Sequence, residues 1–257
     1  KYILPWFGGT PGVWTTCLLF FQCLLLMGYA YAHCLNHFLP PRKQAWVHGG
    51  LLMMAICTLP ITPSEALQPD GEGTPVWAIL KLLGLSLGVP YMILSSTGPL
   101  VQAWFARAHA GASPYRLYAL SNVGSLLALV AYPFVVEPWS TRIEQVNGWS
   151  WGMALYAVFC ALLVWRMRDV PVVTSSKSKA ESGATETRLR RAGVWLGWLA
   201  LPACGTAFLM ATTNKLCQDV AVVPFLWVLP LALYLISFII SFDSPRWYVR
   251  EIYVPLL

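Results

Sequence analysis

Charged side chains are scarce in this chain. Asp, Glu, Lys and Arg make up 11% of its 257 residues, whereas hydrophobic residues make up 57%. A soluble globular domain carries about 25% charged residues, so the composition excludes the ordinary soluble classes and predicts a membrane protein. The net charge is +6, but the basic residues stand in short segments between apolar runs. That distribution predicts orientation in a bilayer and argues against a nucleic-acid partner.

Catalytic and metal-binding motifs are lacking as well. The chain has no HExxH sequence, no glycine-rich phosphate loop and, among its seven cysteines, no CxxC pair. His33 and His37 are four residues apart and share a helix face, but no carboxylate stands near them in the sequence. We therefore interpret them as capping or lipid-headgroup contacts. His48 and His109 have no evident partner, and the sequence predicts no catalytic residue, no metal site and no cofactor.

The apolar residues form seven long segments. A helix that spans a bilayer needs about 20 apolar residues. Pro11 follows Thr10 at the start of the first segment, as is typical of a helix N-terminus. The pattern predicts an all-α polytopic membrane protein with at least seven transmembrane helices. The segments cover residues 12–32, 45–61, 76–97, 115–135, 149–165, 194–213 and 222–242.

Residues 166–193 interrupt the apolar pattern. This segment carries seven basic residues and a tract rich in Ser, Thr, Ala and Gly. It has too few large apolar side chains to offset the entropy of ordering the chain, so we expect a flexible, solvated linker. The linker divides the chain into a first transmembrane bundle, residues 1–165, and the start of a second bundle, residues 194–257.

The basic residues alternate between the two sides of the predicted membrane. Thirteen of the 17 lie in four segments, and the loops between those segments carry only Arg142 and Lys215. Loops rich in Lys and Arg stay in the cytoplasm, so we expect Lys1 to lie on the far side and another helix to precede it. The chain is then a fragment, and six helices before a linker predict a major-facilitator-like bundle. The segments expected in the cytoplasm are residues 33–45, 106–116, 166–193 and 243–250.

Polar side chains within or between the apolar segments are the candidate substrate-binding residues. Segment 115–135 contains an Asn and two Ser residues at helical spacing, which predicts either hydrogen bonds between helices or a polar cavity. A second polar group stands between the last two segments. It forms either a solvated loop or a broken helix of the kind that makes transporter sites. The candidates are Asn122, Ser125, Asn214, Gln218, Asp219 and Trp227.

Small residues recur at four-residue spacing in two segments. Gly84 and Gly88 form one pair, and Gly124 and Ala128 form the other. This spacing gives a flat helix surface for close packing against another helix, either in this chain or in a membrane-protein partner or second copy.

Three stretches of the chain resemble a known family. They are PWFGGTPGVWTTCLLFFQ at residues 5–22, PYRLYALSNVGSLLAL at 114–129 and NKLCQDVAVVPFLWVLP at 214–230. All three resemble the membrane half of bacterial proteins described as fused major facilitator and spermidine synthase. The resemblance implies a multi-pass protein of the bacterial inner membrane and an aminopropyltransferase-like domain beyond this chain. Any such enzymatic activity would lie in that domain, because no glycine-rich nucleotide loop or Asp-rich substrate loop is present here.

Three functions agree with these observations. The first is a transporter-like module that moves or presents a small polar metabolite. A polyamine is the substrate that the family description suggests, but no predicted span contains the acidic residues that a polycation needs. The second is a structural or assembly subunit of a larger membrane complex. The third is a membrane anchor for an aminopropyltransferase-like domain, and in all three the lipid bilayer is the main partner.

Overall fold

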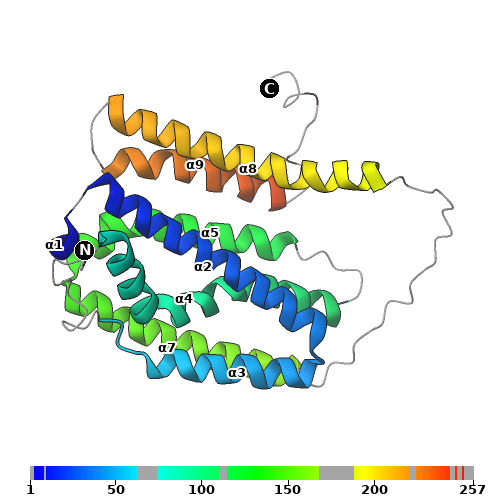
Figure 1. Cartoon of the computed structure of the whole chain (residues 1–257). Helices are drawn as coiled ribbons and strands as arrows, with labels where there is room; N and C mark the ends of the chain where they lie inside the picture. The colour runs from blue at the N-terminus through cyan, green and yellow to red at the C-terminus, as the bar shows by residue number, and fades with distance from the viewer. Residues whose placement is uncertain are drawn as a thin grey trace. The chain divides into compact units, whose positions relative to one another are not determined.

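The computed structural model describes residues 3–8, 10–62, 74–109, 115–167, 188–219, 224–243, 247 and 251. Within these ranges the long elements are all helices, and no strand is present (Figure 1). The elements are α1 (Leu4–Phe7), α2 (Pro11–Phe38), α3 (Pro41–Cys57), α4 (Pro75–Ala108), α5 (Tyr115–Ala131), the π-helical turn η2 (Tyr132–Val136), α6 (Glu137–Trp139), α7 (Arg142–Met167), α8 (Arg188–Asp219) and α9 (Pro224–Asp243).

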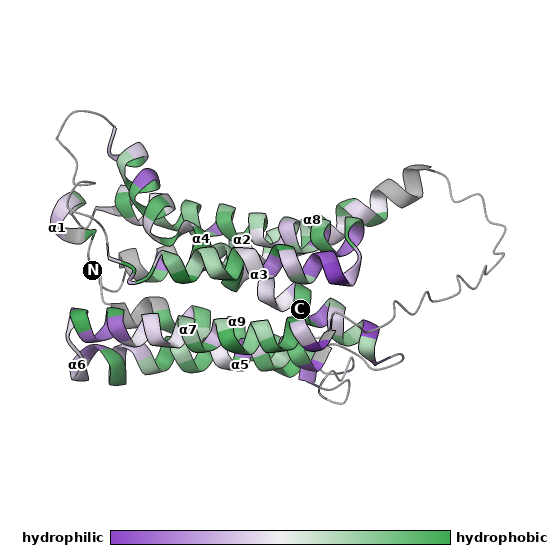
Figure 2. Cartoon of the chain, turned by 90° about the horizontal axis from the view of Figure 1, so that it is seen from below, coloured by the Kyte–Doolittle hydropathy of each residue, from purple (hydrophilic) through white to green (hydrophobic). Residues whose placement is uncertain are grey.

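Five helices of the described part are long and apolar enough to cross a membrane. They cover residues 12–38, 75–108, 116–139, 142–166 and 193–213. The middle of these helices is hydrophobic, and polar residues concentrate toward the ends (Figure 2). The chain is therefore a helical membrane protein in a lipid environment. The other two predicted segments do not meet this criterion, because α3 has 17 residues and residues 228–243 of α9 form a shorter apolar helix. Seven spans therefore stay a prediction.

Several predicted helix ends differ from those in the structure. The sequence predicted a third segment over residues 76–97 with residues 99–109 as an interfacial continuation, and α4 runs as one helix through Pro90 and Pro99 to Ala108. Proline removes a backbone donor, yet in membrane helices neighbouring side chains can satisfy the carbonyl groups that it frees. The first segment likewise extends past residue 32, because α2 continues to Phe38.

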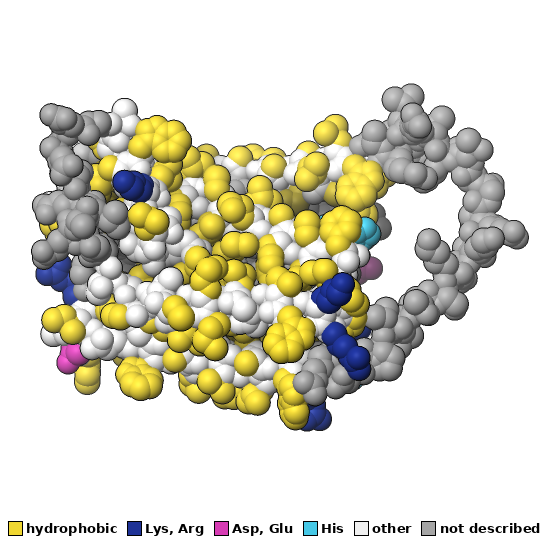
Figure 3. All heavy atoms as spheres, turned by 60° about the horizontal axis from the view of Figure 1, so that its bottom comes forward, with side chains coloured by type: hydrophobic (Ala, Val, Ile, Leu, Met, Phe, Trp, Pro, Cys, Tyr) yellow, Lys and Arg dark blue, Asp and Glu magenta, His cyan; other side chains and the backbone are white. Residues whose placement is uncertain are grey.

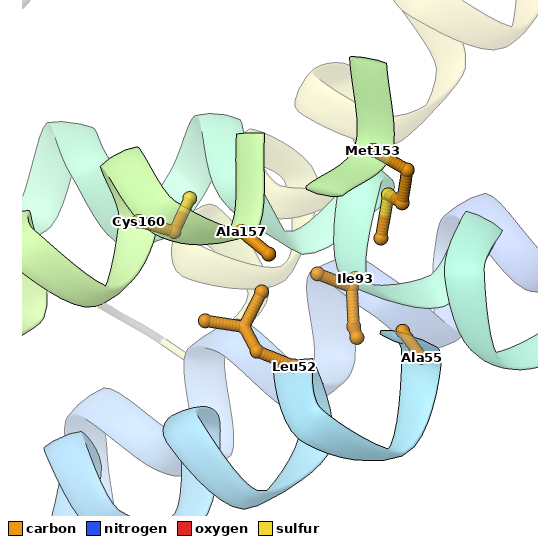
Figure 4. Close-up of a cluster of buried hydrophobic side chains, with 6 residues drawn as sticks. All are labelled: Leu52, Ala55, Ile93, Met153, Ala157 and Cys160. Carbon is orange, nitrogen blue, oxygen red and sulfur yellow. The ribbon is translucent and has the colours of Figure 1, made fainter. Parts of the chain in front are cut away.

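The chain divides into two compact units, of which the first covers residues 1–114 and 139–173. In this unit α2 packs along α4, while α3 packs against α7 and α4. At its centre, side chains of α3, α4 and α7 point toward one another and are buried (Figure 4). Within a bilayer, close packing of this kind holds helices together, because lipid is as apolar as the side chains themselves. The cluster consists of Leu52, Ala55, Ile93, Met153, Ala157 and Cys160.

In the first unit α2, α4 and α7 run in the same direction, and α3 runs in the opposite direction. A second buried cluster joins the C-terminal parts of α2, α4 and α7 through Leu35, Leu100 and Val164. A third cluster joins the N-terminal parts of α2 and α4 through Val13 and Ile79. These directions agree with the alternating loops expected from the basic residues. Lys, Arg and His side chains gather toward the ends of the face seen in Figure 3, and hydrophobic side chains cover its middle.

Gly28 is a position of close approach between α2 and α4. A Cβ atom built on Gly28 would lie 1.9 Å from Ser95 Oγ and 3.2 Å from the carbonyl oxygen of Met92. The glycines of the two small-residue pairs predicted to pack differ from Gly28 in this respect. In the described part of the chain, a Cβ atom on Gly84, Gly88 or Gly124 would meet nothing within 4 Å. These surfaces remain predicted contacts for a partner.

The second unit covers residues 115–138 and 174–257 and contains α5, α8 and α9. Its main contact is between α5 and α9, and α8 packs against α9. Tyr118, near the start of α5, contacts the rings of Phe238 and Phe242, near the end of α9, at centroid distances of 6.0 Å and 4.7 Å. Because the start of α5 lies beside the end of α9, the two helices run in opposite directions. The sequence analysis assigned α5 to the bundle before the linker and α9 to the bundle after it, so this contact joins segments from both sides of the linker.

The described helices also extend into the predicted linker. α7 continues to Met167, and α8 begins at Arg188. Residues 168–187, the rest of the predicted linker, lie outside the described residues.

Candidate functional site

The predicted site residues on α5 bond to their own helix. Asn122 is half-buried and donates from Nδ2 to the carbonyl oxygen of Tyr118 at 2.8 Å. Ser125 is exposed and donates to the carbonyl oxygen of Ser121 at 3.1 Å. In the described part of the chain, the Asn122 Oδ1 atom has no hydrogen-bond partner. This oxygen is therefore available to accept a hydrogen bond from a ligand.

The second predicted group of polar residues lies on an unbroken helix. The sequence predicted that this segment ends at residue 213 and is followed by a loop or a break, but α8 continues through Asp219. No glycine or proline stands between residues 206 and 223 to end the helix earlier. The backbone of Asn214, Gln218 and Asp219 is thus helical. The side chains of these residues and of Trp227 lie outside the described residues.

The two groups lie at different levels of the second unit. Asn122 follows Tyr118 by one turn, so it lies beside the part of α9 around Tyr234 and Phe238. Ten residues of helix, about 15 Å, separate Tyr234 from the start of α9 at Pro224. The C-terminal end of α8 lies at that start of α9 (Figure 1). The structure therefore does not bring Asn122 and the backbone of Asp219 together.

A buried hydrogen-bond network that the sequence analysis missed joins α2, α3 and α4. Gln44 is 1% exposed. Its Oε1 atom accepts from Trp104 Nε1 at 3.0 Å and from Arg107 Nη2 at 2.9 Å. Its Nε2 atom donates to the carbonyl oxygen of Leu39 at 2.7 Å. Arg107 Nη2 also donates to Asn36 Oδ1, so one amide fixes the ends of three helices.

His48 extends this network along α3. The sequence shows no evident partner for His48, but the structure buries its ring and brings its Nδ1 atom within 3.2 Å of the Tyr31 hydroxyl. The ring also lies edge-on to Trp104, with centroids 6.0 Å apart. His33 and His37 lie on one face of α2 as expected, and their rings stack at 5.8 Å.

A sequence signal for this network exists in the spacing of α3. Gln44, His48, Leu52 and Ala55 recur at intervals of three and four residues, and all four are buried. Positions with this spacing share one helix face. A Gln and a His on the same face as a buried Leu and Ala indicate polar groups that need partners in the interior.

Comparison with known proteins adds no relative. No family model, no curated protein and no solved structure matches the chain. The class that the geometry defines is a polytopic helical membrane protein.

Proposed function

We propose that the chain is a transporter-like module that moves or presents a small polar metabolite. The observation that carries this proposal is the pairing of α5 with α9, which joins segments from both sides of the predicted linker. In transporters built from repeated helical halves, the substrate site lies where the halves meet, near the middle of the bilayer. Asn122 belongs to α5 and is half-buried, with its side-chain oxygen available to a ligand.

Proline positions support the same proposal. Pro202 lies inside α8 and Pro230 lies inside α9. An internal proline removes one backbone hydrogen bond and favours a kink, which lets a helix bend at a fixed point. Bends in helices beside a substrate site are one way in which such a site opens alternately to each face.

The substrate class follows from the side chains that are present. The described acidic residues lie at or near helix ends, as Glu137, Glu144 and Asp243 illustrate. A polycation such as a polyamine would require carboxylates in the middle of the membrane. A neutral or anionic polar metabolite therefore fits the proposed module better than a polyamine.

Orientation in a bacterial inner membrane is part of the proposal. Arg42 and Lys43 begin α3 at the same end of the first unit where Arg107 ends α4. Clustered Lys and Arg favour the cytoplasmic side. The resemblance to fused major facilitator and spermidine synthase proteins supports a bacterial inner membrane, with this chain as a membrane module.

Water access to Asn122 tests this function. The test uses a variant in which all native cysteines are replaced with alanine and Asn122→Cys is added. This variant is reconstituted into proteoliposomes, and a membrane-impermeant maleimide is applied to each side in turn. We expect labelling from at least one side, because a substrate path must be wet and maleimide reacts with a hydrated thiolate. Leu127→Cys, on an exposed apolar position of the same helix, is the matched control and is expected to stay unlabelled.

A structural subunit is the second candidate function, favoured by the open surface around Gly84 and Gly88. If the cysteine of the Asn122→Cys variant is not labelled from either side, water does not reach this position. That result would contradict the proposed transport function and favour the structural subunit. Cross-linking at Gly84→Cys would then identify the partner helix.

A further inference from the structure

We propose that the first unit binds a phosphate-type oxyanion in a pocket at the junction of α2, α3 and α4, with Arg107 as the main ligand. The pocket has a volume of about 560 Å³. The residues that line it and carry the argument are Asn36, His37, Pro40, Pro41 and Arg107. This site lies in a different unit from the proposed substrate site on α5 and does not depend on it.

The charge of Arg107 is the first reason. Its guanidinium is half-buried, and its described hydrogen bonds all go to neutral oxygens, namely those of Asn36, Gln44 and the carbonyl of Ala103. Within the described residues no carboxylate pairs with it. A guanidinium has five N–H donors in a planar fork, and those of Nη1 have no described partner. A partly desolvated cation with spare donors is stabilised by an anion that fills the pocket beside it.

The fixed position of Arg107 is the second reason. Gln44 is almost fully buried and is itself held by Trp104 and by the carbonyl oxygen of Leu39. The Gln44 Oε1 atom can therefore hold Arg107 Nη2 in one place. A binding group whose rotamer is fixed by a second layer of hydrogen bonds loses little entropy when a ligand arrives.

No described carboxylate lines the pocket. It lies where α3 begins and where α2 and α4 end, so the partial positive charge of one helix N-terminus is offset by the partial negative charges of two C-termini. Pro40 and Pro41 line the pocket and have no backbone N–H group to donate. The positive charge of the pocket therefore comes from the Arg107 guanidinium.

Two sources could supply the oxyanion, the headgroup of an anionic phospholipid or a soluble phosphate compound. Both present a phosphate with oxygens that match the guanidinium fork. The pocket lies at the end of α2 and α4, where apolar helix surface meets the basic residues, so both sources can reach it.

Binding measurements on the purified full chain in an uncharged detergent test the proposal. The probes are phosphatidylglycerol, phosphatidylcholine as the zwitterionic reference, and glycerol 3-phosphate as the headgroup without acyl chains. We expect phosphatidylglycerol to bind more tightly than phosphatidylcholine, and Arg107→Gln to weaken that binding about tenfold or more, since a hydrogen bond to a charged group is lost. Arg166→Gln removes one exposed charge outside the pocket and is expected to change binding by less than about twofold.

If the Arg107→Gln variant does not fold, the Asn36→Asp variant provides a second test of anion binding. This nearly isosteric change places a carboxylate on Arg107 Nη2, so the chain supplies its own anion. We expect the folded protein to be retained while binding of both anionic probes is lost.

The outcomes separate the sources. Competition between glycerol 3-phosphate and phosphatidylglycerol identifies a site for free phosphate compounds, and binding of phosphatidylglycerol alone identifies a lipid site. Equal binding of the anionic and zwitterionic lipids with no binding of glycerol 3-phosphate would overturn the proposal. Undiminished binding to the folded Asn36→Asp variant would overturn it as well.

Discussion

Gly28→Ala is expected to destabilise the first unit by about 1–3 kcal/mol, the usual cost of forcing extra atoms into a packed interface. The added methyl group would lie 1.9 Å from Ser95 Oγ and 2.9 Å from Ser95 Cβ. Rotating the Ser95 hydroxyl away would relieve only the first of these contacts, because the Cβ atom stays in place. α2 and α4 would have to move apart along their shared interface. The measurement is thermal unfolding of the purified protein in detergent.

Two further variants decide whether this close approach is the cause. Gly50→Ala changes an exposed glycine in α3 whose added Cβ atom would meet nothing within 4 Å. It is expected to leave stability unchanged or raise it by up to about 1 kcal/mol, because alanine favours the helix. Ser95→Gly combined with Gly28→Ala removes the obstructing atoms and should recover much of the loss. An equal loss in the single and the double variant would refute the proposed clash.

Gln44→Leu is expected to have the second large effect. The change removes the acceptor of the Trp104 indole N–H, the acceptor of one Arg107 N–H and the donor to the Leu39 carbonyl oxygen. Each buried polar group left without a partner costs about 1–3 kcal/mol. Trp104 is 6% exposed, so water cannot easily replace the lost bond. A fall in thermal stability and loosened contacts among the ends of α2, α3 and α4 should follow.

A double-mutant cycle isolates the hydrogen bond from the packing. Trp104→Phe removes the indole N–H as well, so no donor is left unpaired at that position when both changes are present. The combined loss is then expected to be smaller than the sum of the two single losses. Strict additivity would mean that the bond between Gln44 and Trp104 contributes nothing to stability.

The membrane class and several helix starts could be predicted from the sequence because they depend on local composition. Thr10 and Pro11 predicted the start of α2, and the structure confirms it. The residue at the first helical position makes no N–H hydrogen bond within the helix, so proline is tolerated there. This preference is local and does not depend on the rest of the fold. The scarcity of charge predicted the membrane class for the same reason, and the long apolar segments predicted helices.

The ends of the helices could not be predicted in this way. Residues 214–219 are polar and resemble a loop in composition, but they carry α8 to Asp219 because no helix-breaking residue stands among them. Pro99 resembles the end of an apolar segment, but α4 passes through it as it passes through Pro90. Polarity and proline are imperfect signals of a boundary inside a membrane protein, where neighbouring helices determine whether the backbone can continue.

The buried network depends on contacts that are distant in the sequence. Gln44 and Trp104 are 60 residues apart, and neither residue type alone indicates a hydrogen bond between them. Only the shared face of Gln44, His48 and Leu52 hinted at buried polar groups. The close approach at Gly28 was also missed, because a glycine in an apolar run shows nothing of the residue that it faces.

The length of α4 determines how deeply the first unit lies in the bilayer. Lys81 and Arg107 are 26 residues apart on this helix, which is about 39 Å along the helix path and an upper limit on their separation, because Pro90 and Pro99 lie between them. The hydrocarbon core of a bilayer is about 30 Å thick, and the headgroup layers bring the total to about 40–45 Å. Each cation can therefore lie in a headgroup layer on its own side of the membrane. A shift of α4 along the membrane normal would draw one of the two charges into hydrocarbon, so the pair holds the helix at a fixed depth.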